Sequence, residues 1–100
     1  MKTEGRQFKE DNMSVYVDTL SVVLRTDRRW PWPTSCHLFS DSLEELHYFA
    51  KEIGLRKGWF QDHGKLPHYD LTVNRRRIAV AHGAIEVSHR FTYTKMQGTV

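Results

Sequence analysis

CHLFSDSLEELHYFAKEIG, residues 36–54, contains a strand, a helix and the signals that separate them. CHLFS favours a strand, and Asp41 or Ser42 can cap the helix that follows. Five apolar residues of the helix recur three or four positions apart and form one stripe, which ends before the helix terminator Gly54. These residues are Leu43, Leu46, Phe49, Ala50 and Ile53. The stretch therefore predicts a strand followed by a helix that covers a sheet.

The flanking segments extend this unit into a small α/β domain. Upstream, VYVDTLSVVL at 15–24 is rich in β-branched residues and predicts a first strand, or two short ones. Downstream, PHYDLT at 67–72 predicts a third strand and AIEVS at 84–88 a last strand. Between them, Thr72 or Asn74 can cap a short helix through RRRIAVAH at 75–82 that ends at Gly83. This order predicts an α/β fold with a short, mostly central sheet of about four strands and two helices.

The length of 100 residues predicts a single domain. Residues 1–13 are polar apart from Phe8 and their terminal methionines, so we expect a flexible leader. One α/β domain is expected over 14–92, followed by a flexible tail over 93–100. RTDRRWPWPTS at 25–35 predicts a loop. In the irregular stretch after the helix, Trp59 and Phe60 can fill the core from a loop.

Composition narrows the class of protein. The 39% hydrophobic and 27% charged residues are typical of a soluble globular domain. The net charge of +3 permits binding to a polyanion without requiring it. Cys36 is the single cysteine, so no intrachain disulfide forms and no oxidising compartment is needed. No apolar run approaches the roughly 20 residues of a membrane helix, and we expect a cytoplasmic protein without membrane attachment.

The strand HYDL at 68–71 predicts a polar site. Side chains alternate along a strand, so His68 and Asp70 point to one side while Tyr69 and Leu71 point to the other. By the same alternation Cys36 and His37 cannot bind one ion together. Paired CxxC or HxxxH motifs are missing, so the strong zinc signatures do not apply.

A sharper hypothesis brings four of these side chains together at one edge of the sheet, with Asp18 nearby. They are His37, His47, His68 and Asp70. Two histidines and a carboxylate can bind a divalent metal such as zinc or manganese, and a carboxylate can instead orient a histidine for acid–base catalysis by His68, Asp70 and His37. The alternative is a structural hydrogen-bond cluster, with His47 at the margin of the core.

The loop at 25–35 interleaves basic and aromatic residues. Arg28 and Arg29 precede Trp30 and Trp32, and guanidinium groups beside indoles can hold a phosphate while stacking on a base. In the alternative interpretation, the two tryptophans fasten the loop to the core beneath solvated arginines.

Three arginines open the expected helix at 75–82. Arg75 and Arg76 could bind a phosphate together with the exposed amides of the first turn. Cations at a helix start oppose the helix dipole, so Arg75, Arg76 and Arg77 indicate a compensating anion. Glu86 or Asp70 could equally be that anion, which would make Arg76 structural.

Several short motifs together resemble the bacterial and phage family catalogued as domain of unknown function 4031, over residues 14–88. They are YVD at 16–18, CH at 36–37 with Asp41 after it, EELH at 44–47, IG at 53–54, WFQ at 59–61, HYD at 68–70, and RR with the later AV and GAIEV between 75 and 87. The resemblance implies a compact cytosolic domain in which the histidines and aspartates act as a set. The loop at 25–35 and the link DHGKL at 62–66 are longer than the family pattern leads one to expect.

The leading functional prediction is a phosphate-recognising domain that acts on or binds nucleic acid or a nucleotide, with a metal-assisted phosphoesterase as its enzymatic form. The alternative is a metal-free structural or protein-interaction module of bacterial or phage origin. The sequence contains no nucleophile elbow and no glycine-rich phosphate loop, so it does not support a serine hydrolase or a P-loop enzyme. The oligomeric state stays open.

Overall fold

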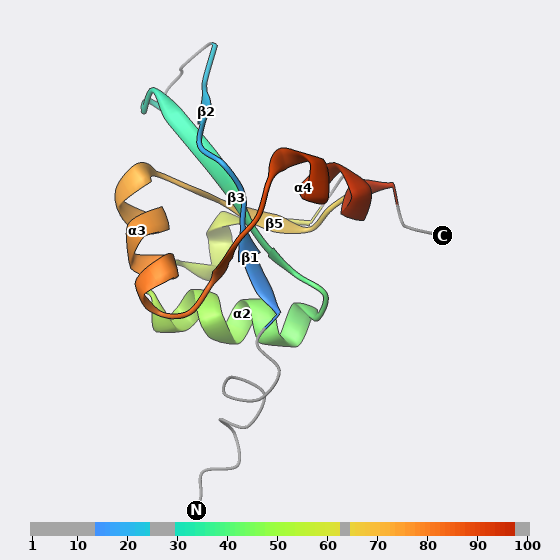
Figure 1. Ribbon diagram of the computed structural model, residues 1–100. Coiled ribbons are helices and arrows are strands. Elements are labelled where there is room, and N and C mark those ends of the chain that lie inside the picture. The colour runs from blue at the N-terminus through green and yellow to red at the C-terminus, as the bar shows by residue number, and fades with distance from the viewer. Residues whose placement is uncertain (1–13, 25–29, 63–64, 98–100) are drawn as a thin grey trace, which may run out of the picture.

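The computed structural model describes residues 14–24, 30–62 and 65–97, and within them it has three α-helices, a short 3₁₀ helix and six strands (Figure 1). The elements are β1 Val15–Val17, β2 Ser21–Val22, β3 Thr34–Ser40, α2 Leu43–Glu52, η2 Lys57–Trp59, β4 Phe60–Gln61, β5 His68–Leu71, α3 Val73–Ala81, β6 Ile85–Glu86 and α4 His89–Met96. The predicted α/β class is confirmed, with more strands and one more α-helix than expected.

The strands form one mixed sheet in the order β4-β5-β3-β1-β6, and β2 pairs with the start of β3. β3 is central because it runs antiparallel to both β1 and β5. The edge strand β6 returns parallel to β1 after α3. In the β3–β5 register, His37 lies opposite Asp70 and Leu38 lies opposite Tyr69. This register decides which side chains share a face.

Helix α2 begins and ends where the sequence indicates. The Ser42 hydroxyl accepts a hydrogen bond from the Glu45 amide at 3.2 Å, which resolves the predicted choice of cap. Gly54 follows the helix with a φ of 85°, a left-handed conformation that glycine adopts without strain. Leu43 is half-exposed, so the buried stripe begins one turn later, at Leu46.

Helix α3 begins after the first of its two possible caps, Thr72 and not Asn74. The Thr72 hydroxyl accepts a hydrogen bond from the Arg75 amide at 3.2 Å, so the helix begins at Val73 and Thr72 is its cap. It ends before Gly83, which has a φ of 107°.

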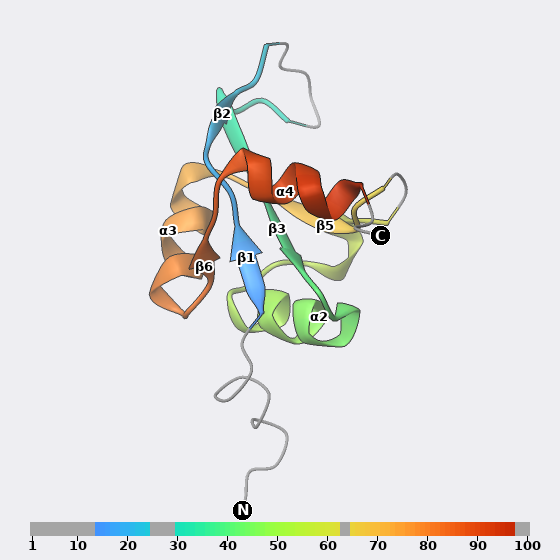
Figure 2. The same cartoon turned by 45° about the vertical axis from the view of Figure 1, so that its right-hand side comes forward.

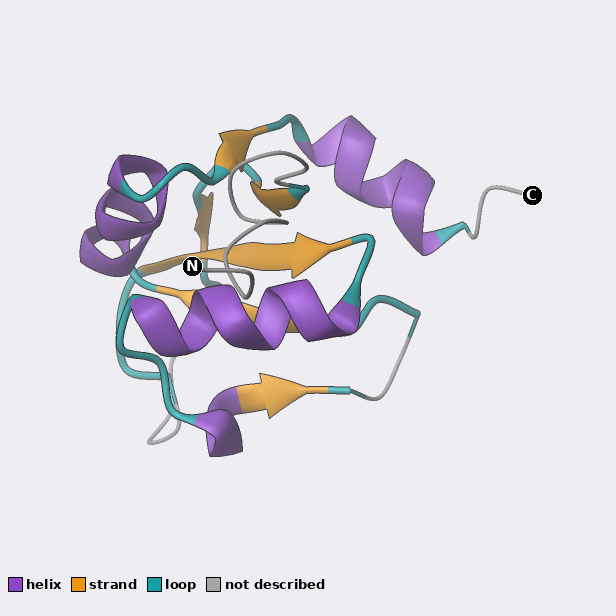
Figure 3. Ribbon diagram, turned by 90° about the horizontal axis from the view of Figure 1, so that it is seen from below, coloured by secondary structure: helices purple, strands orange, loops and turns teal. Residues whose placement is uncertain are grey.

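One face of the sheet is covered by α2 and α3 and forms the hydrophobic core. Figure 3 shows α2 lying alongside the strands. The core residues are Val15, Val17, Cys36, Leu38, Leu46, Phe49, Ala50, Ile53, Leu55, Tyr69, Leu71, Ala79 and Ala84. Phe60 packs against this cluster as expected, whereas Trp59 is 44% exposed and does not fill the core.

Helix α4 lies on the other face of the sheet, where Figure 2 shows it crossing in front of the strands. The Phe91 ring lies 5.0 Å from Tyr16 and 6.3 Å from Phe39, centroid to centroid. Both partners alternate with core residues along their strands, so their rings point away from the core. At the far end of the helix, Lys95 forms an ion pair with Asp41 at 2.7 Å.

The sequence predicts no helix after residue 88, and residues 93–96 of the expected tail lie in α4. The expected domain boundary at residue 92 thus falls inside a helix. The expected leader at 1–13, residues 98–100 of the tail, Arg28 and Arg29 all lie outside the described residues. Across the part of the chain that the structure describes, no helix has the length and apolar character needed to cross a membrane.

Candidate functional site

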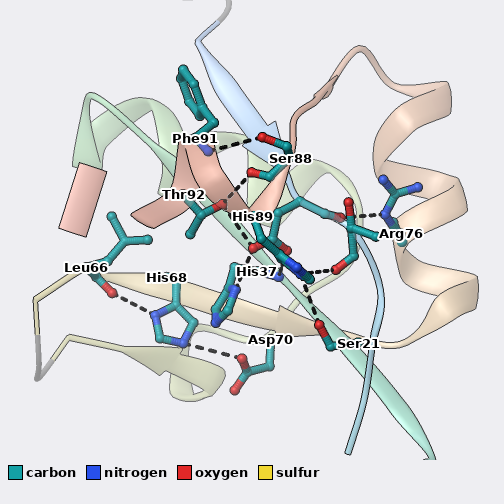
Figure 4. Close-up of polar contacts among 12 residues, drawn as sticks. Ser21, His37, Leu66, His68, Asp70, Arg76, Ser88, His89, Phe91 and Thr92 are labelled. Carbon is teal, nitrogen blue, oxygen red and sulfur yellow. Dashed lines mark hydrogen bonds and ion pairs between the residues drawn. The ribbon is translucent and has the colours of Figure 1, made fainter. Parts of the chain in front are cut away.

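Strands β3 and β5 bring three predicted site residues together on the face opposite the core (Figure 4). His68 and Asp70 alternate with the buried Tyr69 and Leu71, as the sequence predicts. His37 joins them from β3 because it lies opposite Asp70 in the register. The spacing of β5 and the pairing with β3 are thus sufficient to assemble the cluster.

The three side chains are close enough to bind one ion. One ligand atom from each of His37, His68 and Asp70 lies within 4.8 Å of the others. The two imidazole rings meet edge to face, with centroids 4.8 Å apart. His68 Nε2 lies 3.3 Å from Asp70 Oδ1. All three residues are partly exposed, so the cluster is open to solvent.

The tautomer of His68 is set by the backbone, whereas its pKa depends on Asp70 as well. His68 Nδ1 donates a hydrogen bond to the carbonyl of Leu66 at 2.7 Å, because a carbonyl can only accept. In the neutral ring the lone pair is then on Nε2, the atom that faces Asp70. Burial opposes protonation of His68, but the hydrogen bonds to Asp70 and to the Leu66 carbonyl outweigh it and raise the pKa.

His37 is held in the same tautomer by Asp18. The carboxylate accepts a hydrogen bond from His37 Nδ1 at 2.8 Å and another from the His37 amide at 2.7 Å. The hydroxyl of Thr92, on α4, donates a third at 3.0 Å. Burial would raise the pKa of Asp18, which is fully buried, but these hydrogen bonds outweigh burial and lower it. Asp18 is therefore a buried carboxylate with its partners in place.

These three side chains could hold a divalent metal ion. Histidine ligands in proteins usually donate their second nitrogen to a carboxylate or a carbonyl, which fixes the ring and its tautomer. Asp18 and the Leu66 carbonyl are such partners for His37 and His68. Two Nε2 atoms and one carboxylate suit zinc or manganese and leave a coordination position for water or substrate.

His47 does not join the cluster, and the predicted four-residue convergence is wrong at this position. Its Nδ1 lies 2.9 Å from the hydroxyl of Tyr69, and its ring meets Phe60 with centroids 4.5 Å apart. Tyr69 points to the opposite face from His68, and α2 covers that face. His47 thus lies at the margin of the core, as the alternative interpretation has it, with a tyrosine as partner.

The basic residues of α3 mainly hold the fold together. Arg76 donates through Nε to the carbonyl of Asp18 at 2.9 Å and contacts Glu86 at 3.3 Å, which matches the structural alternative. Arg75 donates to the carbonyl of Ile53 at 3.1 Å. Its guanidinium carbon also lies 6.0 Å from the centre of the Trp59 ring, so Arg75 reaches an aromatic surface as well.

A cavity of about 410 Å³ adjoins the cluster, and Asp70 belongs to both. All three tryptophans of the chain line it. Trp30 and Trp32 meet edge to face at 4.9 Å, and the Trp30 indole donates to the Thr34 carbonyl at 3.2 Å. Trp32 is 45% exposed, so the loop is not simply fastened to the core by both indoles.

Three site features were missed in the sequence. Thr92 belongs to α4, a helix that is not predicted from the sequence. The clear sequence signal for this helix is its N-cap Ser88, whose hydroxyl accepts a hydrogen bond from the Phe91 amide. The sequence predicts Trp59 in the core, whereas it lines the cavity and is 44% exposed. Asp18 was placed nearby but not as the partner of His37. Cys36 is buried in the core, on the face opposite the cluster, and burial raises the pKa of its thiol to about 12.

A model of a known protein family matches residues 15–98, nearly the whole described chain. No curated protein and no solved structure matches the chain significantly. The family match agrees with the resemblance in the sequence motifs and covers every residue of the cluster. The chain therefore belongs to the family described as Protein of unknown function (DUF4031).

Proposed function

We propose that the domain binds a divalent metal ion through His37, His68 and Asp70 and acts as a metal-assisted phosphoesterase on a nucleotide or nucleic acid. One observation carries the proposal. Both histidines already give their Nδ1 proton to a fixed acceptor, which leaves two Nε2 atoms beside one carboxylate. A merely structural cluster does not require this matched orientation.

The residues around the cluster have defined roles in this proposal. Asp18 keeps the proton of His37 on Nδ1 and orients the ring, and Thr92 and the His37 amide hold Asp18 in turn. His68 Nε2 and Asp70 Oδ1, now 3.3 Å apart, would be two of the ligand atoms. A metal ion held in this way lowers the pKa of a bound water and stabilises charge on a phosphoryl oxygen.

The competing function is a metal-free structural or protein-interaction module, of bacterial or phage origin. It is supported by the 3.3 Å contact between His68 and Asp70, which already gives each a partner. In that case the cluster only stabilises the sheet. We favour the metal centre because the second nitrogen of each ring is also fixed, and because a cavity adjoins Asp70.

Titration of tag-free, metal-depleted protein with zinc or manganese tests the proposal by calorimetry. We expect one ion per chain, a rise in melting temperature with the ion, and loss of both in His68→Ala and Asp70→Ala. His82→Ala is the matched control, because this exposed histidine directly follows α3 and its ring bonds to the carbonyl of Ile78 at 3.0 Å. Binding that is absent, or equally strong in His68→Ala, would refute the metal centre.

Activity is tested separately with bis(p-nitrophenyl) phosphate and with short oligonucleotides. We expect metal-dependent hydrolysis by the parent protein and none by His68→Ala. Stoichiometric metal without hydrolysis of either substrate would contradict the phosphoesterase and leave a metal-stabilised binding domain.

We place this activity in the cytoplasm, where nucleotides and nucleic acids are found. The single cysteine, buried in the core, is in keeping with a reducing compartment. Cell fractionation of the tag-free protein tests this, and recovery from the periplasm or the medium would contradict it.

A further inference from the structure

The cavity beside Asp70 has an aromatic lining from two separate segments. Trp30 and Trp32 come from the stretch before β3, and Trp59 comes from η2. Trp32 and Trp59 are 45% and 44% exposed, although large aromatic rings usually gain by burial. Half-exposed indoles around a concave surface offer flat faces on which a planar ring can stack.

Positive charge lies next to this aromatic surface. The guanidinium carbons of Arg56 and Arg75 lie 5.8 and 6.0 Å from the centre of the Trp59 ring. Arg75 also lines the cavity. A ligand that satisfies both features carries a planar ring together with an anionic group. Nucleotides have this combination, and an apolar peptide does not.

Polar groups line the cavity on the side of the cluster of His37, His68 and Asp70. Gln61, Thr72 and Asp70 contribute an amide, a hydroxyl and a carboxylate to its lining. Gln61 lies directly opposite His68 in the β4–β5 register, so the cavity and the cluster share one face of the sheet. Asp70 belongs to both sites, which places one end of a bound ligand next to the metal ligands.

The size of the cavity limits the form of the ligand. About 410 Å³ is within the range of pockets that hold one small molecule. The bases of a duplex are paired and stacked, so they cannot enter such a pocket without being extruded.

We infer that the three-tryptophan cavity binds one unpaired nucleobase, so that the substrate is a mononucleotide or the unpaired end of a strand and not a duplex. The inference deepens the proposed function and rests on it for the reaction, because the phosphate of the bound nucleotide then lies toward the metal cluster. Binding of the base itself needs no metal ion.

Intrinsic fluorescence is a direct test, because every tryptophan of the chain lines the cavity. Adenosine and uridine 5′-monophosphates are titrated into metal-free protein in EDTA, with ribose 5-phosphate as the probe that lacks a base and a blunt duplex as the paired probe. We expect the mononucleotides to quench the fluorescence, whereas ribose 5-phosphate and the duplex leave it unchanged.

Two variants assign the quenching to the cavity. Trp59→Ala should weaken mononucleotide binding on the order of tenfold, measured by calorimetry, because one stacking surface is lost. Tyr93→Ala, which removes an aromatic ring that is 61% exposed on α4, is the matched control and should bind like the parent. Equal weakening in both variants would overturn the assignment.

The outcomes separate this inference from the metal proposal. Mononucleotides that quench the fluorescence in EDTA and still bind to His68→Ala support nucleobase binding in the cavity. If calorimetry then detects no metal binding, only the proposed reaction fails. Stoichiometric metal binding without any nucleotide response overturns the inference and leaves the metal centre standing. Quenching by ribose 5-phosphate alone, or by proline-rich peptides instead of nucleotides, also overturns it.

Discussion

The two faces of the sheet are built from the same strands but have opposite properties. On the α2 and α3 face, Leu38 and Tyr69 are buried in a continuous apolar core. On the other face, their neighbours His37, His68 and Asp70 are partly exposed and paired through polar contacts. Helix α4 covers the part of that face near Phe39 and Tyr16, and its Thr92 reaches Asp18.

The difference shows that residues that stabilise the core and residues that form the candidate site can alternate along one strand. In β5 the odd-numbered residues are buried in the core and the even-numbered residues form the candidate site. A substitution on one face should therefore leave the other face largely intact, except where a buried group joins them. Asp18 is such a group, since it is fully buried and yet orients His37.

The largest effect on stability is expected from Leu38→Ala, because Leu38 is fully buried at the centre of the core. Such truncations lose about 2–5 kcal/mol of unfolding free energy. Urea unfolding measures the loss. Gln61→Ala, on the opposite face and opposite His68 in register, should change it by less than about 1 kcal/mol. Similar losses in the two variants would contradict the division between faces.

Asp18→Asn tests the group that joins the faces. An asparagine offers one acceptor oxygen where the carboxylate accepts from His37 and Thr92, so we expect a loss of about 1–3 kcal/mol in unfolding free energy. Metal affinity, measured by calorimetry, should fall about 10- to 100-fold because His37 loses its orienting partner. Asp41→Asn, an exposed aspartate beside Lys95, should bind the ion like the parent. Unchanged affinity in Asp18→Asn would contradict the role of Asp18.

Tyr16→Phe tests how α4 is attached to the polar face. Burial first, and then the hydrogen bond to Asp41, raise the pKa of Tyr16 above 10.0. The neutral hydroxyl therefore stabilises the fold fully below the unfolded value, and this contribution is lost as the pH rises through the folded pKa. At pH 7 we expect Tyr16→Phe to cost about 0.5–1.5 kcal/mol, with the gap to the parent closing in alkali.

Melting temperatures of the parent and of Tyr16→Phe across the alkaline range measure this change. Tyr93→Phe, at an exposed position, is the control and should follow the parent throughout. A gap that stays constant with pH would contradict the raised pKa of Tyr16, and no gap at pH 7 would mean that its hydroxyl contributes nothing to the attachment.

The smallest effect is expected from Glu86→Gln. Glu86 is 60% exposed and meets Arg76 at 3.3 Å, and exposed ion pairs typically contribute about 0–1 kcal/mol. Arg76→Gln should destabilise more in the same urea experiment, because Arg76 also donates to the carbonyl of Asp18. Equal effects would show that the contact with Asp18 is unimportant.

Local signals were enough to predict most of the fold. The alternation in HYDL, the stripe of α2 and the glycines after α2 and α3 each act within a few residues, and the structure has all of them. Helix α4 was missed because threonine and aromatic residues give it a weak helical signal, and its place is fixed by distant partners. Phe91 contacts Tyr16, and Thr92 contacts Asp18.

The candidate site could be predicted only where strand alternation decides the geometry. His68 and Asp70 share a face for that reason, and pairing with β3 then adds His37. The position of His47 depends on which face α2 covers, and a helical stripe does not reveal that. The tryptophan cavity likewise depends on how η2 and the stretch before β3 meet in space, which no local pattern records.

The hydrogen bond from Thr92 to Asp18 spans 74 positions of the chain, and it has a consequence for protein synthesis. Strands β1, β3 and β5 all precede Thr92 in the chain, so the sheet can form while the carboxylate of Asp18 still lacks this donor. The support of His37 is then complete only when α4 docks. A chain cut before Thr92 would carry His37, His68 and Asp70 without the donor that helps to hold Asp18 in place.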